Sequence, residues 1–302
     1  MPHGILLLDK PLGLSSNAAV QRVRRVFARE KAGHTGSLDP LATGMLPICL
    51  GEATKVAGYL LEGDKEYEFT MRLGERTATG DLEGEVVERC EPPADPAAAL
   101  QAVIPAFLGP LRQVPPMYSA LKREGQPLYQ LARQGIEVER EARHITIHDL
   151  QLLAVEGTEA SLRVICSKGT YVRTLAEDLA RAAGSCAHLS ALRRTLVAPF
   201  PGTAMVTLAA LEADPAAAQL LAPDAAVPQL PAAEIDAEAT RRVRMGQAVA
   251  AGPEAGAAVG LVRLYGPGRV FLGIGERLMA GNGTTVLLKP VRLFNDLGVI
   301  TA

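Results

Sequence analysis

Residues 66–73 alternate strictly between apolar and polar side chains, and this pattern limits the possible folds more than any other stretch of the chain. The apolar members of the pattern are Tyr67, Phe69, Met71 and Leu73. A period of two places these side chains on one face of an extended strand. The first requirement on the fold is therefore a β-sheet with an apolar face.

Single helices and further strands are predicted around this segment. Residues 5–8 form a short apolar run, predicted as a buried strand that ends in a turn at residues 10–13. Ser15 or Ser16 can then cap a helix with one apolar face. A further helix is predicted at residues 96–103.

Two more strands are predicted, each with an irregularity. Pro47 interrupts the apolar run 45–50, and because proline cannot donate to a β-ladder, this run is predicted as an edge or bulged strand. Residues 162–172 are predicted as a strand followed by a helix, for which Thr174 and Glu177 would form a capping box.

Strands and single helices follow one another without a repeated β-α-β order and without an internal repeat. This order predicts an α+β fold with a mixed, largely antiparallel sheet and flanking helices. Residues 201–231 are rich in alanine and proline and contain no basic residue, which predicts a short helix and a linker. Short strands separated by glycines follow, at residues 260–264, 269–274 and 284–288. The chain is therefore expected to divide into a domain of residues 1–230, with its linker at about 201–230, and a small β-rich domain of residues 231–302.

The net charge of −2 hides a segregation of charge along the chain. Residues 62–100 carry eleven acidic against four basic residues, whereas residues 112–135 have a net charge of +3 and residues 161–200 one of +4. Nucleic acid binding depends on a local basic surface rather than on the total charge. Ordinary alternation of surface charge would look the same, so this pattern permits RNA binding without requiring it.

The four cysteines are widely spaced and form no C-x-x-C pair, which argues against a zinc knuckle and against a disulfide framework. They are Cys49, Cys90, Cys166 and Cys186. We expect them to be reduced, small core residues of a cytoplasmic protein. The apolar run at residues 5–8 is too short for a signal segment or a membrane span, so no membrane partner is expected.

A glycine-rich segment at residues 33–44 contains the first candidate for catalysis, Asp39. Its composition predicts a loop whose backbone can approach a ligand closely, and proline after Asp39 disfavours a helix there. The alternative is a structural aspartate in an Asx-turn or at a helix cap. No Gly-Lys-Ser/Thr follows, which excludes a Walker loop. No second carboxylate or cysteine lies close enough in the segment to indicate a metal site.

Tyr171 and Arg173 are the second candidates, within the sequence Ser-Lys-Gly-Thr-Tyr-Val-Arg-Thr. In an extended chain both side chains point to one side, where they could hold a planar polar ring, and the arginine could pair with Asp39. A core tyrosine and a solvated arginine are the ordinary alternatives. The same choice applies to Tyr67, as a core aromatic or a ligand contact, and to His34, as an exposed loop residue or a ligand contact.

Six motifs stand in the order found in bacterial TruB-type tRNA pseudouridine synthases, and through them the chain resembles that family over roughly residues 1–200. They occupy residues 10–13 (Lys-Pro-Leu-Gly), 33–44, 51–55 (Gly-Glu-Ala-Thr-Lys), 115–120 (Pro-Pro-Met-Tyr-Ser-Ala), 167–174 and 188–195 (His-Leu-Ser-Ala-Leu-Arg-Arg-Thr). The tail resembles the family's PUA-type RNA-binding domain more loosely. One departure from the family pattern, Ala-Gly-Ser-Cys at residues 183–186, could alter the packing behind Leu192.

The resemblance implies a catalytic set of three residues. Asp39 matches the family's nucleophile, and Arg173 matches the arginine that pairs with that carboxylate. Tyr67 matches a tyrosine that contacts the target base, where it can stack and take part in proton transfer. An aspartate suits this role because its ordinary pKa, about 3.9, leaves it ionised at neutral pH.

The resemblance also implies four substrate-binding residues and an insertion that contacts RNA. Tyr171 matches a second tyrosine at the target base, Leu192 an apolar contact to that base, and His34 a residue near the flipped nucleotide. Lys55 matches a lysine close to the site. The RNA-contacting insertion is expected at about residues 112–145.

The reaction implied by the resemblance is the conversion of the T-loop uridine at tRNA position 55 to pseudouridine, by a monomeric enzyme. The N1–C1′ bond breaks, the flipped uracil turns, and C5 joins C1′, so neither a cofactor nor a metal is expected. Two other classes of function stay open on the residues alone. One is a non-catalytic RNA-binding protein or chaperone, and the other is a metabolic enzyme that binds a nucleotide or phosphate in the glycine-rich loop.

Overall fold

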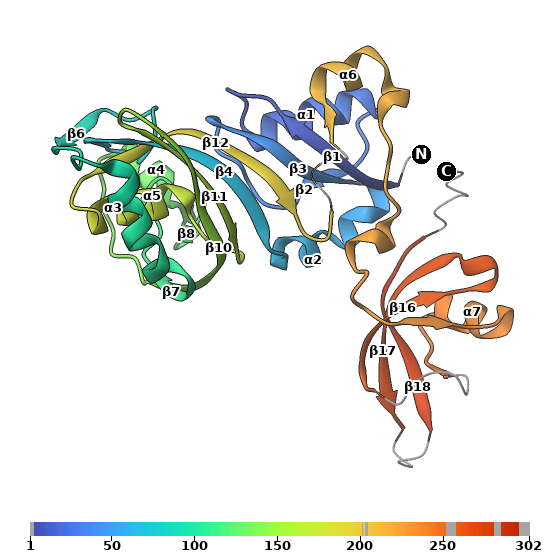
Figure 1. Ribbon diagram of the computed structural model, residues 1–302. Helices are drawn as coiled ribbons and strands as arrows, with labels where there is room; N and C mark the ends of the chain where they lie inside the picture. Colours follow the sequence, from blue (N-terminus) through green and yellow to red (C-terminus); the bar gives the residue numbers. More distant parts are fainter. Residues whose placement is uncertain (1–2, 201, 203–204, 252–257, 281–284, 296–302) are drawn as a thin grey trace.

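A computed structural model describes residues 3–200, 202, 205–251, 258–280 and 285–295. Its main feature is a nine-stranded sheet in the order β13-β1-β3-β12-β4-β11-β10-β7, with β2 paired to β3 (Figure 1). The strands are β1 (Gly4–Lys10), β2 (Ala32–His34), β3 (Ala42–Leu50), β4 (Lys65–Leu73), β7 (Gly109–Gln113), β10 (Arg143–Glu156), β11 (Glu159–Cys166), β12 (Ala187–Val197) and β13 (Val206–Thr207). Among the described pairings of this sheet, only β1–β13 and β3–β12 are parallel. The predicted α+β fold with a largely antiparallel sheet is confirmed.

Six helices accompany this sheet in the described residues before the small C-terminal sheet. They are α1 (Ser16–Val26), α2 (Ala57–Glu62), α3 (Pro96–Val103), α4 (Leu128–Arg133), α5 (Val172–Ala182) and α6 (Leu208–Ala213). Two small hairpins lie beside them, formed by β5 (Glu75–Thr77) with β6 (Val86–Arg89) and by β8 (Lys122–Arg123) with β9 (Gln126–Pro127). Of all the described helices, none is both long and apolar enough to cross a membrane.

The alternation that opened the sequence analysis builds the main core. In β4 every second residue is buried, so Phe69 and Met71 face the core while the polar residues between them are more accessible. The same core takes in Val23 of α1 and Leu175 of α5. Helices α1 and α5 therefore cover one face of the sheet, and at about 25 cal/mol per Å² this apolar burial is the main force that holds them there.

Two predictions about helices are confirmed. Helix α3 spans Pro96–Val103, as predicted. Ser15 is the N-cap of α1, and its side chain accepts a hydrogen bond from the N–H of Ala18. Helix α5 stops two residues before Gly184, which adopts a φ of +80°, a left-handed conformation that glycine tolerates at a helix end.

The predicted capping box of Thr174 and Glu177 is wrong, because α5 begins earlier. Strand β11 ends at Cys166 rather than near residue 172, and the first helical residue is Val172 with Tyr171 as N-cap. Tyr171 and Arg173 therefore belong to the first turn of a helix and not to an extended strand.

The prediction that Pro47 marks an edge or bulged strand is also wrong. Strand β3 lies inside the sheet, with β1 on one side and first β12, then β2, on the other. The N–H of Thr35 donates to the carbonyl oxygen of Pro47 at 3.1 Å, so the nitrogen of Pro47 also faces the β2 side. The pairing with β2 stops at Ile48, and the pairing with β12 stops at Gly44. Pro47 therefore lies between the stretch of β3 that pairs with β12 and the stretch that pairs with β2. Neither pairing requires the N–H that proline lacks.

A narrow seam joins the two halves of the large sheet. Strand β12 pairs with β4 along nearly all its length but with β3 at only three positions, Leu192, Arg193 and Arg194. At the last of these, Gly44 has a φ of +95°, and a Cβ there would lie 2.2 Å from the carbonyl oxygen of Arg194. Only glycine allows the strands to approach this closely.

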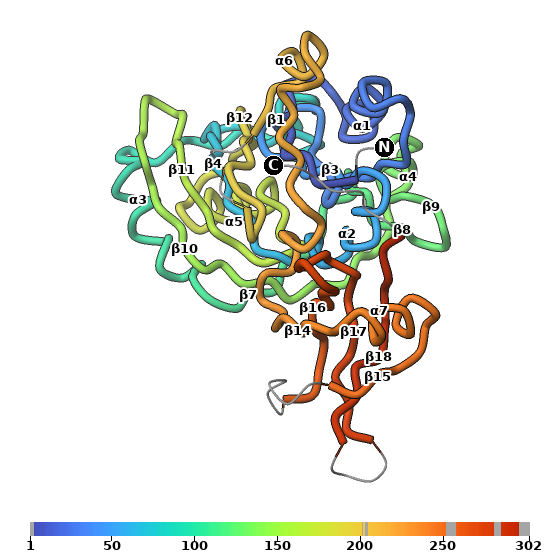
Figure 2. The backbone as a smooth tube through the Cα atoms, turned by 90° about the vertical axis from the view of Figure 1, so that its right-hand side faces the viewer, coloured from blue at the N-terminus to red at the C-terminus, as the bar shows by residue number. Residues whose placement is uncertain are grey.

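The C-terminal part forms a separate five-stranded sheet in the order β14-β16-β17-β18-β15, which confirms the β-rich expectation (Figures 1 and 2). Its elements are β14 (Ala232–Glu234), α7 (Ala237–Arg244), β15 (Val249–Ala250), β16 (Gly260–Tyr265), β17 (Phe271–Met279) and β18 (Val286–Leu293). Thr284, the first residue of a predicted strand, lies outside the described residues. Phe271 and Phe294 share an apolar cluster with Ile5 of β1, so the small sheet packs against the large one.

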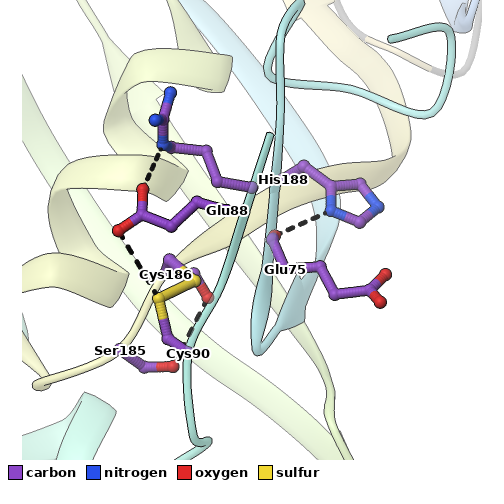
Figure 3. The surroundings of a disulfide bond; sticks show 7 residues. Glu75, Glu88, Cys90, Ser185, Cys186 and His188 are labelled. Carbon is purple, nitrogen blue, oxygen red and sulfur yellow. Dashed lines mark hydrogen bonds and ion pairs between the residues drawn. A yellow bond between two sulfur atoms is a disulfide. The ribbon is translucent and has the colours of Figure 1, made fainter. Parts of the chain in front are cut away.

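The expectation of four reduced cysteines is wrong for two of them. Cys90 follows β6 and Cys186 precedes β12, and the structure joins them in a disulfide across 96 residues of sequence (Figure 3). Wide spacing along the chain carries no information about distance in space. Here Gly74 brings the segments of Cys90 and Cys186 together. Its N–H donates to the carbonyl oxygen of Cys186 at 2.8 Å, and its own carbonyl oxygen accepts from the N–H of Cys90 at 2.9 Å. Cys49 and Cys166 are free and buried, as expected.

Replacing both disulfide cysteines by alanine should lower the free energy of unfolding by about 2–4 kcal/mol, because the crosslink restricts a long loop of the unfolded chain. Urea denaturation of the oxidised protein and of the Cys90→Ala/Cys186→Ala variant measures this difference. A thiol reductant should lower the midpoint of the wild-type protein and leave that of the variant unchanged. Equal midpoints for the oxidised protein and the variant would contradict a stabilising crosslink.

Candidate functional site

One pocket of about 400 Å³ gathers five of the seven residues that the family resemblance implies. They are Asp39, Tyr67, Tyr171, Arg173 and Leu192. Four elements supply them: the loop between β2 and β3, strand β4, the start of α5, and strand β12. Leu61 of α2 and residues 119–121 also line this pocket.

Arg173 is the electrostatic centre of this pocket. Its side chain is only 6% exposed, and its guanidinium lies 3.1 Å from a carboxylate oxygen of Asp39 and 3.7 Å from one of Asp81. The guanidinium also donates to the carbonyl oxygens of Thr79 at 2.7 Å and Tyr118 at 2.6 Å. A buried cation needs such partners, since an unpaired charge in the interior costs several kcal/mol. The predicted pairing of Asp39 with Arg173 is present in the structure.

The pKa of Asp39 is set by opposing effects. Withdrawal of the carboxylate from bulk water raises its pKa above the ordinary value, and nearby Asp81 raises it further. Arg173 and Lys10 oppose this rise by favouring the charged form. The side chain remains 44% exposed, so the carboxylate can be reached from the pocket. The net pKa shift is upward, and Arg173 therefore keeps the ionised form available against the effect of burial.

Tyr67 lies beside a second buried arginine, Arg194. Burial raises the pKa of Tyr67, and Arg194 opposes this shift. Arg194 is 1% exposed, and it donates to the carbonyl oxygens of Met45 at 2.7 Å and Gly36 at 3.1 Å. The phenol of Tyr67 is therefore protonated at neutral pH, and Arg194 fixes the loop that carries Asp39.

Sequence reasoning missed three charged residues of this site: Lys10, Asp81 and Arg194. Lys10 is fully buried and donates to the carbonyl oxygens of Pro11 at 2.9 Å and Leu14 at 2.6 Å. Burial lowers its pKa to about 8. Lys10 and Arg194 belong to recognised motifs, which was the available signal. Asp81 lies in an acidic stretch with no local pattern, so nothing in the sequence marked it.

Two residues implied by the resemblance lie elsewhere. Lys55 donates to Glu52 at 2.6 Å and to the carbonyl oxygen of Leu293 at 2.8 Å, and its ammonium lies 5.6 Å from the centre of the Phe294 ring. It therefore joins the small sheet to the large one, and the lysine that lines the pocket is Lys65. His34 is partly buried on β2 and is not among the pocket residues.

The described residues contain no group of three or more histidine, cysteine, aspartate or glutamate side chains that could hold a metal ion. The pocket offers a reachable carboxylate, two buried guanidinium groups and two tyrosines. These groups suit nucleophilic attack on a planar, polar substrate.

Comparison with protein families agrees with this geometry. Residues 24–172 match the model of the TruB family pseudouridylate synthase N-terminal domain, residues 173–224 that of the tRNA pseudouridylate synthase B C-terminal domain, and residues 231–294 that of the pseudouridine synthase II TruB C-terminal region. The chain is 55% identical over 297 residues to tRNA pseudouridine synthase B of Aromatoleum aromaticum, an alignment that covers 97% of this chain and 93% of the relative. This chain belongs to the TruB family of pseudouridine synthases. It is an isomerase, so it is neither a non-catalytic protein nor a metabolic enzyme that acts on a free nucleotide.

Other relatives of this TruB-family enzyme agree in sequence and in fold. It is 51% identical to tRNA pseudouridine synthase B of Aeromonas salmonicida, over 91% of this chain and 89% of the relative. A chain in the structure of an H/ACA RNP bound to a substrate RNA containing 2′-deoxyuridine superposes with a TM-score of 0.71 at 26% identity, covering 97% of this chain and 85% of that one. A chain of a Cbf5-Nop10-Gar1 complex superposes with a TM-score of 0.68 at 27% identity, over 96% and 84% of the two chains.

The Asp81→Asn substitution should lower the pKa of Asp39. It removes a negative charge that raises this pKa and leaves Arg173 with one carboxylate partner instead of two. Carboxyl-carbon NMR of the aspartates, titrated against pH, measures the change. Asp64→Asn, at a half-exposed carboxylate, is the control and should leave the titration of Asp39 as it is. An unchanged or raised pKa in Asp81→Asn would contradict the shared pairing of Arg173.

Proposed function

We propose that this TruB-family enzyme converts the T-loop uridine at tRNA position 55 to pseudouridine, with Asp39 as the nucleophile. The observation that carries this proposal is the contact of 3.1 Å between Asp39 and the buried Arg173. It combines a reachable carboxylate with a fixed cation that keeps it charged. The relatives named tRNA pseudouridine synthase B support tRNA as the substrate.

The pocket suits a single nucleotide turned out of the RNA. A uridine stacked inside a T loop cannot react, and flipping it out costs a few kcal/mol. Aromatic stacking returns about 1–3 kcal/mol per base, and Tyr67 and Tyr171 are the aromatic residues lining the pocket. Leu192 adds an apolar wall. Once the base is held, the ionised Asp39 acts as the nucleophile and is regenerated at the end of the reaction. The N1–C1′ bond breaks, the uracil turns within the pocket, and C5 joins C1′; C5 then loses its proton and N1 gains one, so substrate and product are isomers.

The RNA backbone would follow the basic parts of the chain. Residues 112–135 and 161–200 have net charges of +3 and +4, respectively. Lys122 and Arg123 form strand β8 in the first of these segments, and Lys168 and Arg181 in the second have exposed side chains. Basic side chains of a protein attract the phosphates of a nucleic acid without reading its sequence. The enzyme is proposed to act in the cytoplasm and as a monomer.

The Asp39→Asn substitution should abolish pseudouridine formation and leave both the fold and tRNA binding intact. The amide has nearly the same shape but is no nucleophile. The test is incubation with an unmodified tRNA transcript, followed by mapping of pseudouridine at each position. Asp64→Asn is the matched control and should retain full activity. Product at another position, or none from the wild-type protein, would overturn the assigned substrate, and clear turnover by Asp39→Asn would remove the nucleophile from its role.

The Tyr67→Phe substitution should slow the chemical step by about a hundredfold or more while tRNA affinity stays close to that of the wild type. The ring still stacks on the base, but the hydroxyl that can donate or pass on a proton is lost. Single-turnover rates and filter-binding affinities separate the two effects, with Tyr59→Phe as the control outside the pocket. A wild-type rate in Tyr67→Phe would exclude the hydroxyl from proton transfer.

A further inference from the structure

Gln113, the last residue of β7, uses both ends of its side-chain amide on a single residue of α5. Its Nε2 donates to the carbonyl oxygen of Tyr171 at 3.1 Å, and its Oε1 accepts from the N–H of Tyr171 at 2.8 Å. Gln113 is only 5% exposed, so water competes weakly for these hydrogen bonds. The side chain thus pairs with the Tyr171 backbone as a neighbouring strand would.

The start of α5 needs such a partner. Tyr171 is the N-cap residue, and its own side chain makes no capping hydrogen bond to the first turn of the helix. Its carbonyl oxygen already accepts the first helical bond, from the N–H of Leu175 at 3.0 Å. Its N–H has no partner within the helix and would be left unpaired in a mostly buried position. Gln113, 58 residues earlier in the chain, therefore acts as the cap of α5.

Two catalytic-site side chains follow directly from this capped turn. Tyr171 is the capped residue itself, and Arg173 lies two residues later, with its guanidinium against Asp39. The segment that follows Gln113 makes a further contact with Arg173. The carbonyl oxygen of Tyr118 accepts from Arg173 at 2.6 Å, and Ser119 lines the same pocket as Tyr171. The beginning of the insertion thus contacts the backbone of Tyr171 and the guanidinium of Arg173.

We propose that Gln113 is a positioning residue of the isomerase: it fixes the first turn of α5 and so sets the distance between Arg173 and Asp39. The part of this inference that concerns the reaction rests on the proposed role of Asp39. The part that concerns geometry does not. Because Gln113 begins the insertion at residues 112–145, the clamp links the segment proposed to contact RNA to the pair that carries the chemistry.

The Gln113→Met substitution tests the clamp, since methionine fills a similar volume without the two hydrogen bonds. The first measurement is the pKa of Asp39 by carboxyl-carbon NMR, which needs no activity. Arg173 should move away from Asp39, and the pKa should rise above that of the wild type. The second is the split between tRNA affinity, expected within about twofold of wild type, and the single-turnover rate, expected to fall about tenfold to a hundredfold for a displacement near 1 Å.

Gln151→Met, at an exposed glutamine on β10, is the matched control and should change neither quantity. If Gln113→Met folds poorly, Gln113→Asn replaces it. The asparagine amide is one methylene too short to reach Tyr171, so a higher pKa of Asp39 and a lower single-turnover rate are again expected. An unchanged pKa of Asp39 would overturn the route through Arg173, and an unchanged rate would overturn the effect on the reaction. Turnover by Asp39→Asn in parallel would refute the proposed function instead, and the pKa measurement would still decide the clamp.

Discussion

The structure around the site depends on one constraint, which is that the guanidinium of Arg173 carries its charge away from solvent. Such a group is stable only when oxygen atoms surround it. The chain provides them from three separate places: the glycine-rich loop, the β5–β6 hairpin with both a side chain and its backbone, and the insertion. Each of these segments is therefore drawn to the start of α5. Asp39 gains its place by being one of the oxygens that this cation requires, and the same contact keeps the carboxylate ionised against burial.

Much of this arrangement could be predicted from local patterns. The alternation in β4, the cap of α1 and the boundaries of α3 each depend on neighbouring residues, and each was found as predicted. The family resemblance gathered Asp39, Tyr67 and Arg173 correctly into one pocket. Recognition of an ordered set of motifs succeeds where single residues leave two interpretations open, because several independent matches must coincide.

The failures share a physical cause, which is that they depend on partners far away in the sequence. Nothing near Cys90 shows that Cys186 lies beside it, since Gly74 joins the two. Pro47 is acceptable inside a sheet only because two different strands meet next to it. Asp81 becomes part of the site through Arg173 alone. In each case the residue type was interpreted by its usual behaviour, and the tertiary structure supplied an exception.

The seam in the large sheet has a consequence for how the enzyme responds to its substrate. Asp39 belongs to the half built on β3, whereas Tyr67 and Arg173 belong to the half built on β4 and α5, and only three residue pairs of β3 and β12 connect the halves directly. The ion pair between Asp39 and Arg173 thus spans this seam. Any bending of the sheet about that line alters the separation of the two charges and hence the basicity of the carboxylate. A bound RNA that grips both halves would in this way tune the reactivity of Asp39 mechanically.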